Sequence, residues 1–106
     1  MKRDEFDFTK QVLQLAKLLG WRTAHFRPAM MANGRWLTAV SGDGKGFPDL
    51  VLVRGKRLLF VELKTDIGEL SDEQIYWMAA LAQTGAGAMV WRPRMWAAIQ
   101  HELERT

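Results

Sequence analysis

The sequence has 106 residues, of which 48% are hydrophobic and 25% are charged, and its formal net charge is +3. This length and composition predict one globular domain, residues 1–106, with a single core. The chain has no cysteine, which excludes disulfides, thiol nucleophiles and cysteine-ligated zinc. No stretch approaches the roughly 18 apolar residues of a membrane span, and the N-terminus lacks a signal peptide's apolar run, so we expect a cytoplasmic protein without a membrane partner.

Apolar residues at helical spacing predict a first helix of about fifteen residues, which Gly20 ends. These residues are Phe8, Val12, Leu15, Ala16 and Leu19. Acidic residues at positions 4, 5 and 7 suit the positive end of the helix dipole. The stretch from Trp21 to Phe26 alternates bulky and polar residues and predicts a strand that ends before Pro28.

The segment 29–46 has weaker signals. Leu37 to Val40 indicates a short strand, and the glycine-rich run from Gly42 to Gly46 indicates a loop that closes over a substrate. This run is no P-loop, because the required Gly-Lys-Ser/Thr is absent. Trp36 could stack on a nucleic-acid base, although most of the five tryptophans fall where core packing explains them better.

Two short apolar runs, residues 50–53 and 58–63, predict a β-hairpin. A two-residue turn at Gly55-Lys56, with glycine first, gives the type II′ geometry that suits right-twisted strands. That turn sets Asp49 opposite Glu62, and like charges in this position destabilise a sheet unless something positive lies between them. The strand period of two places Lys64 on the same face as Glu62.

Asp49, Glu62 and Lys64 are therefore expected to converge at one end of the hairpin. Two carboxylates with room for water and a phosphate oxygen are typical of a Mg²⁺ or Mn²⁺ site. Alternatively, Asp49 is a turn residue and Glu62 with Lys64 is a solvated salt bridge. The apolar residues around Glu62 favour the first interpretation, because they indicate a strand covered on both faces.

Ser71 and Gln74 form a capping box that predicts a second helix, which Gly85 ends. The residues expected to face the sheet are Ile75, Met78, Leu81 and Ala82. Gly87 to Trp91 predicts a strand, and Pro93 starts a last helix whose inward residues are expected to be Trp96, Ile99 and Leu103. The fold class is therefore α/β, with helices covering a mixed central sheet.

Basic residues are concentrated between positions 22 and 57, a segment that contains seven basic residues and only two acidic ones. The candidates for nucleic-acid contacts are Arg22, His25, Arg27, Arg35, Lys45 and Arg54, with Arg92 after the last strand. This excess suits a phosphate backbone, although a solvated basic face is the plainer explanation. For His25, an ordinary strand residue is the plainer explanation, and neither histidine has the spacing of a zinc ligand.

The ordered set of motifs resembles the VRR-NUC branch, the virus-type replication-repair nucleases, of the PD-(D/E)XK nuclease superfamily. The motifs are Gly20-Trp21, Gly46-Phe47-Pro48-Asp49, Glu62-Leu63-Lys64 and Ser71-x-x-Gln74. The resemblance spans about residues 5–93 and implies the restriction-endonuclease-like fold. It also implies that Glu5, or another acid of the first helix, joins the site, and that Gln74 lies close to it in addition to its capping role.

The expected function is a Mg²⁺-dependent DNA endonuclease. Asp49 and Glu62, with the Leu63 carbonyl, would ligate the metal, and Lys64 would act on the attacking water and the transition state. The resemblance implies branched DNA, such as a Holliday junction or flap, as the substrate, and a homodimer as the assembly. Two alternatives are a non-catalytic nucleic-acid-binding module of the same fold and a protein-interaction domain.

Overall fold

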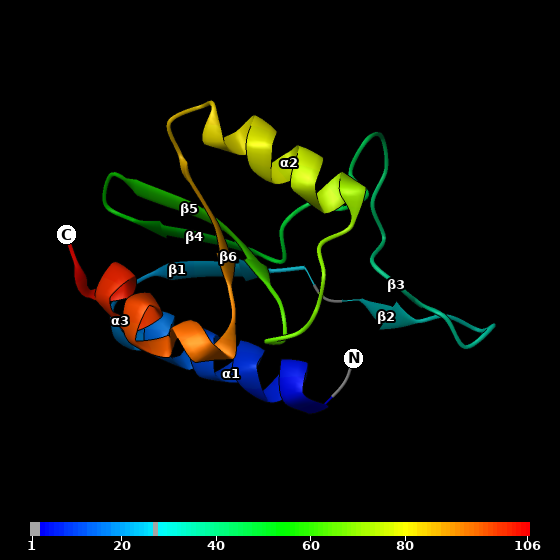
Figure 1. Cartoon of the computed structure of the whole chain (residues 1–106), viewed down its shortest axis with the longest axis horizontal. Helices are drawn as coiled ribbons and strands as arrows, with labels where there is room; N and C mark the ends of the chain where they lie inside the picture. Colours follow the sequence, from blue (N-terminus) through cyan, green and yellow to red (C-terminus); the bar gives the residue numbers. More distant parts are fainter. Residues whose placement is uncertain (1–2, 27) are drawn as a thin grey trace.

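The computed structural model describes residues 3–26 and 28–106 of the chain (Figure 1). Its elements are, in order, α1 (Arg3–Leu18), β1 (Arg22–His25), β2 (Ala29–Met30), β3 (Trp36–Leu37), β4 (Leu50–Arg54), β5 (Arg57–Leu63), α2 (Asp72–Ala82), β6 (Gly87–Trp91), the short 3₁₀ helix η1 (Pro93–Met95) and α3 (Trp96–Glu104). The first helix, the hairpin, the second helix, the last strand and the last helix therefore lie where the sequence predicts them.

A mixed sheet of four strands, in the order β1-β4-β5-β6, forms the centre of the molecule. The first two pairings are antiparallel, whereas β5 and β6 run parallel and are joined through α2. Helices α1 and α3 lie on one face of this sheet and α2 on the other (Figure 1). The predicted α/β architecture with a mixed sheet flanked by helices is confirmed, and it agrees with the restriction-endonuclease-like fold.

The period of two along β5 divides its side chains between the two faces. Leu59, Val61 and Leu63 are buried in the core cluster with residues of α1 and α3. Phe60 turns to the other face, where its ring meets that of Phe47 edge-on, with centroids 5.9 Å apart. Both faces of β5 are thus covered at its end, as the apolar run in the sequence indicates.

The β4–β5 turn has the predicted form. Gly55 has φ 60°, Lys56 is not in the positive-φ region, and Arg54 is paired with Arg57. Glycine is favoured at the first turn position because a side chain is strained at this φ. The turn therefore fixes the register of the whole hairpin, and Leu50 lies opposite Val61 as expected.

Two predictions about local structure are wrong. Ile75 does not face the sheet but is 52% exposed, and Ala82 is exposed as well. The half-buried side of α2 instead carries Gln74, Trp77, Met78 and Leu81, at helical spacing. The helix is rotated from the expected orientation because the Trp77 ring packs against Phe47, with centroids 5.1 Å apart.

The second error concerns the segment before the hairpin. Its strand is β3, at Trp36–Leu37, and not the predicted stretch from Leu37 to Val40. β3 pairs with β2, a strand that the sequence analysis missed, in a separate two-stranded sheet. Strands of two residues carry too little hydrophobic periodicity to be seen in a sequence.

Arg54 anchors the hairpin to both helices on one face of the sheet. Its guanidinium donates hydrogen bonds to the carbonyls of Leu19 (3.1 Å), Leu103 (2.7 Å) and Arg105, and it lies 4.7 Å from the centroid of the Trp21 ring. These contacts occupy the donors that a phosphate would need. Arg54 is therefore a structural residue, and its predicted role in DNA binding is not supported.

None of the helices in the described part of the chain is long and apolar enough to span a membrane.

Replacing Arg54 by alanine is expected to lower the free energy of unfolding by about 2–4 kcal/mol. The Leu19 carbonyl loses its side-chain donor, the Leu103 and Arg105 carbonyls each lose one of two donors, and the contact with Trp21 is removed. Urea unfolding followed by circular dichroism measures the change. Arg22→Ala is the matched control, since Arg22 is exposed on β1. Equal midpoints for the Arg54 variant and the unmodified protein would contradict the anchoring role.

Candidate active site

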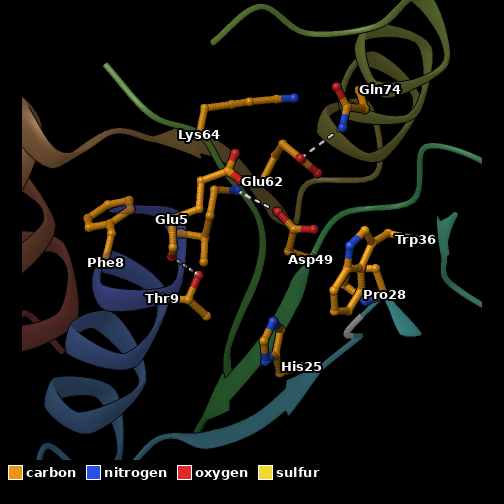
Figure 2. A pocket seen from close by; sticks show the side chains of 11 residues that line it. Glu5, Phe8, Thr9, His25, Pro28, Trp36, Asp49, Glu62, Lys64 and Gln74 are labelled. Atoms are coloured by element: carbon orange, nitrogen blue, oxygen red, sulfur yellow. Dashed lines mark hydrogen bonds between the residues drawn. The ribbon is translucent and has the colours of Figure 1, made fainter. Parts of the chain in front are cut away.

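The register of the hairpin brings two carboxylates together at its open end. Because Leu50 pairs with Val61, the next position outward places Asp49 opposite Glu62 on the same face of the sheet. Both residues line one pocket, together with Leu63 and Lys64 (Figure 2). The predicted convergence of Asp49, Glu62 and Lys64 is therefore present.

Asp49 is fixed by main-chain contacts on both sides. Its Oδ2 accepts a hydrogen bond from the Leu63 N–H at 2.9 Å, and its carbonyl accepts one from the Phe26 N–H at 2.9 Å. Burial raises the pKa of Asp49, although the Leu63 N–H and the nearby charges of His25 and Lys64 act in the opposite direction. The side chain is thus tied to β5 and the main chain to the end of β1.

Glu62 is only 3% exposed, which is rare for a carboxylate. Its Oε2 accepts a hydrogen bond from Gln74 Nε2 at 2.9 Å, whereas its Oε1 is buried without a partner in the described part of the chain. Burial, followed by the charge of Asp49, raises the pKa of Glu62 to about 9, despite the opposing charge of Lys64. Without a cation, the pair therefore holds a proton at neutral pH.

Gln74 performs both of the roles considered for it. Its Oε1 accepts from the Ser71 N–H (2.8 Å) and its own N–H donates to Ser71 Oγ (3.2 Å), which completes the capping box of α2. The amide nitrogen remains available and donates to Glu62. The start of α2 thus holds the Glu62 carboxylate in place.

Gly46 brings the chain close enough to α2 for this arrangement. It has φ +84°, and a Cβ at this position would lie 2.7–2.8 Å from main-chain atoms of Glu73 and Gln74. Only glycine fits such a close approach at a positive φ. The loop before Asp49 and the helix that carries Gln74 are therefore packed directly against each other.

The active-site pocket has a volume of about 300 Å³. Besides the predicted residues Glu5 and His25, it is lined by Thr9, Pro28 and Trp36, which the sequence analysis did not assign to this pocket. Thr9 Oγ1 donates to the Glu5 carbonyl at 2.7 Å, one turn back on α1. No signal in the sequence marks Thr9 or Pro28, because only the folded arrangement of α1 and of the segment after β1 brings them to this pocket.

The site offers oxygen ligands, but not a complete cage. Among the described residues, no three acidic, histidine or cysteine side chains lie close enough to hold one ion together. Figure 2 shows the Glu5 side chain directed into the pocket from α1, while Asp49 and Glu62 come from the hairpin. The two hairpin carboxylates are thus the candidate pair of metal ligands, and Glu5 lines another part of the same pocket.

A family model described as the VRR-NUC domain matches residues 11–95 of the chain. The chain belongs to the VRR-NUC family. The matched segment contains Asp49, Glu62, Lys64 and Gln74, so the resemblance seen in the motifs is confirmed, whereas Glu5 precedes it. No curated protein matches the chain at a significant level.

Among solved structures, the Holliday junction resolvase Hjc of the hyperthermophilic archaeon Archaeoglobus fulgidus is similar to this chain. The identity is 19% and the TM-score is 0.45, over 88% of this chain and 68% of the resolvase chain.

The predicted nucleic-acid contacts of the VRR-NUC chain are scattered. His25 lines the active-site pocket, and Arg22, Arg35 and Lys45 are exposed, with Lys45 Nζ 3.3 Å from a Glu73 carboxylate oxygen. Arg27 lies outside the described residues. The Arg92 guanidinium donates to the carbonyls of Thr65 (2.7 Å) and Gly68 (2.6 Å). Like Arg54, Arg92 therefore has a structural role that leaves its prediction as a phosphate contact unsupported.

The proton held by Glu62 predicts how the stability of the metal-free VRR-NUC domain depends on pH. The folded protein retains this proton up to a pKa of about 9, whereas a glutamate in the unfolded chain loses it near its ordinary pKa of 4.5. Raising the pH between these values therefore lowers the free energy of unfolding, by up to about 1.4 kcal/mol per pH unit.

Glu62→Gln should remove this dependence, because a glutamine can keep the contact with Gln74, donate to Asp49 and does not titrate. Urea unfolding in EDTA, at about pH 5 and about pH 8, is the measurement. The variant should become the more stable of the two proteins at the higher pH. A stability difference that does not change with pH would contradict the shifted pKa.

Proposed function

We propose that this VRR-NUC domain is a metal-dependent DNA endonuclease that hydrolyses phosphodiester bonds at the pocket formed by Asp49, Glu62 and Lys64. The observation that carries the proposal is the buried Oε1 of Glu62, which has no hydrogen-bond partner among the described residues and lies beside a second carboxylate. Burying two carboxylates side by side costs stability. If no cation bound here, the protein would be more stable with neutral residues in place of Asp49 and Glu62. The presence of this pair is explained if a cation binds there.

The donor set fits Mg²⁺, with Mn²⁺ as the alternative. Asp49, Glu62 and the Leu63 carbonyl would hold the ion, and Glu5 would complete the shell through a water molecule. Bound there, the ion would lower the pKa of a water molecule and offset the charge of phosphate oxygens. This fit explains why the buried Glu62 Oε1 has no hydrogen-bond partner in the part of the chain that the structure describes.

The remaining pocket residues have roles that follow from their contacts. Lys64 is half-buried, and Figure 2 shows its side chain extended toward Gln74 over the pocket. We assign it to the attacking water, which it holds or deprotonates, and to the negative charge that develops in the transition state. Gln74 keeps Glu62 oriented through the hydrogen bond to Oε2.

The DNA backbone would cross the face that contains the pocket. Among the predicted contacts, His25 and the exposed cations Arg22, Arg35 and Lys45 remain candidates, while Arg54 and Arg92 do not. Branched DNA, a Holliday junction or a flap, is the substrate class that the resemblance to VRR-NUC nucleases implies. Cleavage of linear, flap and four-way DNA with and without Mg²⁺ tests the whole proposal.

Lys64→Ala is expected to lower the cleavage rate at least about a hundredfold, because one charged contact to the transition state is lost. Single-turnover cleavage of a flap or four-way DNA in Mg²⁺ measures the rate. Binding of Mg²⁺ and of DNA should remain largely intact in this variant. Lys56→Ala is the matched control, since Lys56 is an exposed lysine at the hairpin turn, away from the pocket.

Unchanged turnover in the Lys64 variant would remove this residue from the mechanism. Glu62→Ala distinguishes a metal ligand from a residue such as Lys64 that acts on the reaction. This variant should weaken Mg²⁺ binding itself, which calorimetry measures. Normal Mg²⁺ binding by that variant would contradict the assignment of the metal site.

A homodimer is proposed because one chain carries one such site, whereas cutting two strands of a branched substrate needs two. Light scattering at micromolar concentration is expected to give twice the mass of 12.1 kDa. A monomer at this concentration, still able to cut both strands of a four-way junction, would contradict the dimer.

A further inference from the structure

A second cavity opens beside the active-site pocket. It has a volume of about 780 Å³ and lies between α2 and the loop from Leu37 to Gly46. Its wall shares Trp36, Pro28, Asp49 and Gln74 with the active-site pocket. The two cavities are therefore neighbours around the same carboxylate, and we call the larger one the aromatic groove.

Three rings fixed against one another form the floor of the aromatic groove. The Phe47 ring meets Phe26 and Trp77 edge-on, with centroids 5.7 and 5.1 Å apart. The indole N–H of Trp77 donates to the Asp43 carbonyl at 3.0 Å, which ties the loop to α2. Because these rings already contact one another, the floor of the groove is preorganised for binding.

Trp36 stands where the two cavities meet. Its side chain is 51% exposed, and Figure 2 shows the indole beside Pro28, on the opposite side of Asp49 from Glu5 in this view. A large aromatic side chain that folding leaves half open, next to an apolar cavity, is typical of a binding surface. Here that surface adjoins the residues proposed to hold a phosphodiester.

The rim of the aromatic groove is polar, although its floor is apolar. Thr38 and Ser41 supply hydroxyl groups, and Lys45 supplies an ammonium group whose side chain is 83% exposed. A flat ring with hydrogen-bonding groups along its edge matches this combination of apolar floor and polar rim. A nucleobase has this chemistry, and every base presents a face that stacks on an aromatic ring.

We propose that the aromatic groove binds one unpaired nucleobase of the DNA strand whose phosphodiester lies at Asp49, Glu62 and Lys64, with Trp36 stacking on that base. This inference rests on the proposed nuclease function and adds a feature of its substrate. A base inside a duplex has both faces covered by its neighbours, so only an unpaired or extruded base can enter. The groove would thus direct the site to positions where pairing is interrupted.

Two DNA molecules test the proposal directly. One is a duplex with a single unpaired thymine, and the other is the same duplex with an abasic residue in place of that thymine. Their affinities are measured by fluorescence anisotropy in EDTA, so that no cleavage occurs. Stacking of one base is worth about 1–3 kcal/mol, so the unmodified protein should bind the thymine-containing DNA roughly 5–150 times more tightly.

Trp36→Ala should lose most of this preference, and Trp36→Phe, which keeps an aromatic face, should retain most of it. Tyr76→Ala is the matched control, because Tyr76 is an aromatic residue of α2 that is 78% exposed and lines neither cavity. Its preference should equal that of the unmodified protein. Circular dichroism of each variant checks that the fold is intact.

Equal affinities for the two DNA molecules, or an undiminished preference in Trp36→Ala, would overturn the proposal. Mg²⁺-dependent cleavage without any base preference would contradict the role of the groove but leave the nuclease function standing. A preference for the thymine-containing DNA without Mg²⁺-dependent cleavage would support the role of the groove but contradict the nuclease function. A protein that bound neither DNA would contradict both.

Discussion

The repulsion between a buried and a half-buried carboxylate, Glu62 and Asp49, is the constraint around which this end of the molecule is arranged. The hairpin turn places Asp49 opposite Glu62, and burial removes the water that would weaken their repulsion. A main-chain N–H of β5 holds one carboxylate, and the amide of Gln74 holds the other. Lys64 partly offsets the charge, and the rest is left to a proton or a divalent cation.

Local rules were sufficient to predict the centre of this arrangement from the sequence. A two-residue turn fixes the register of a hairpin, so Gly55 determines which residue lies opposite Glu62. The capping box likewise depends on residues three positions apart, Ser71 and Gln74, and could be read directly. Both features depend on short-range geometry, which the sequence contains in full.

Features that depend on contacts between distant segments could not be predicted in the same way. Arg54 looks like a surface cation in the sequence, but its partners are carbonyls at the ends of α1 and α3. Ile75 has the spacing of a core residue, yet the packing of Trp77 on Phe47 turns it outward. The aromatic groove also depends on distant contacts, because its walls come from three separate stretches of the chain, Phe26 with Pro28, residues 36–49 and residues 74–77.

We propose that the Asp49–Glu62 pair keeps a proton in the absence of a cation and would release it on binding Mg²⁺. Calorimetric titration with Mg²⁺ at about pH 7, in buffers with different ionisation enthalpies, measures the number of protons released. The expected result is release of about one proton per site, and much less from Glu62→Gln. Binding of Mg²⁺ that releases no proton from the unmodified protein would contradict it.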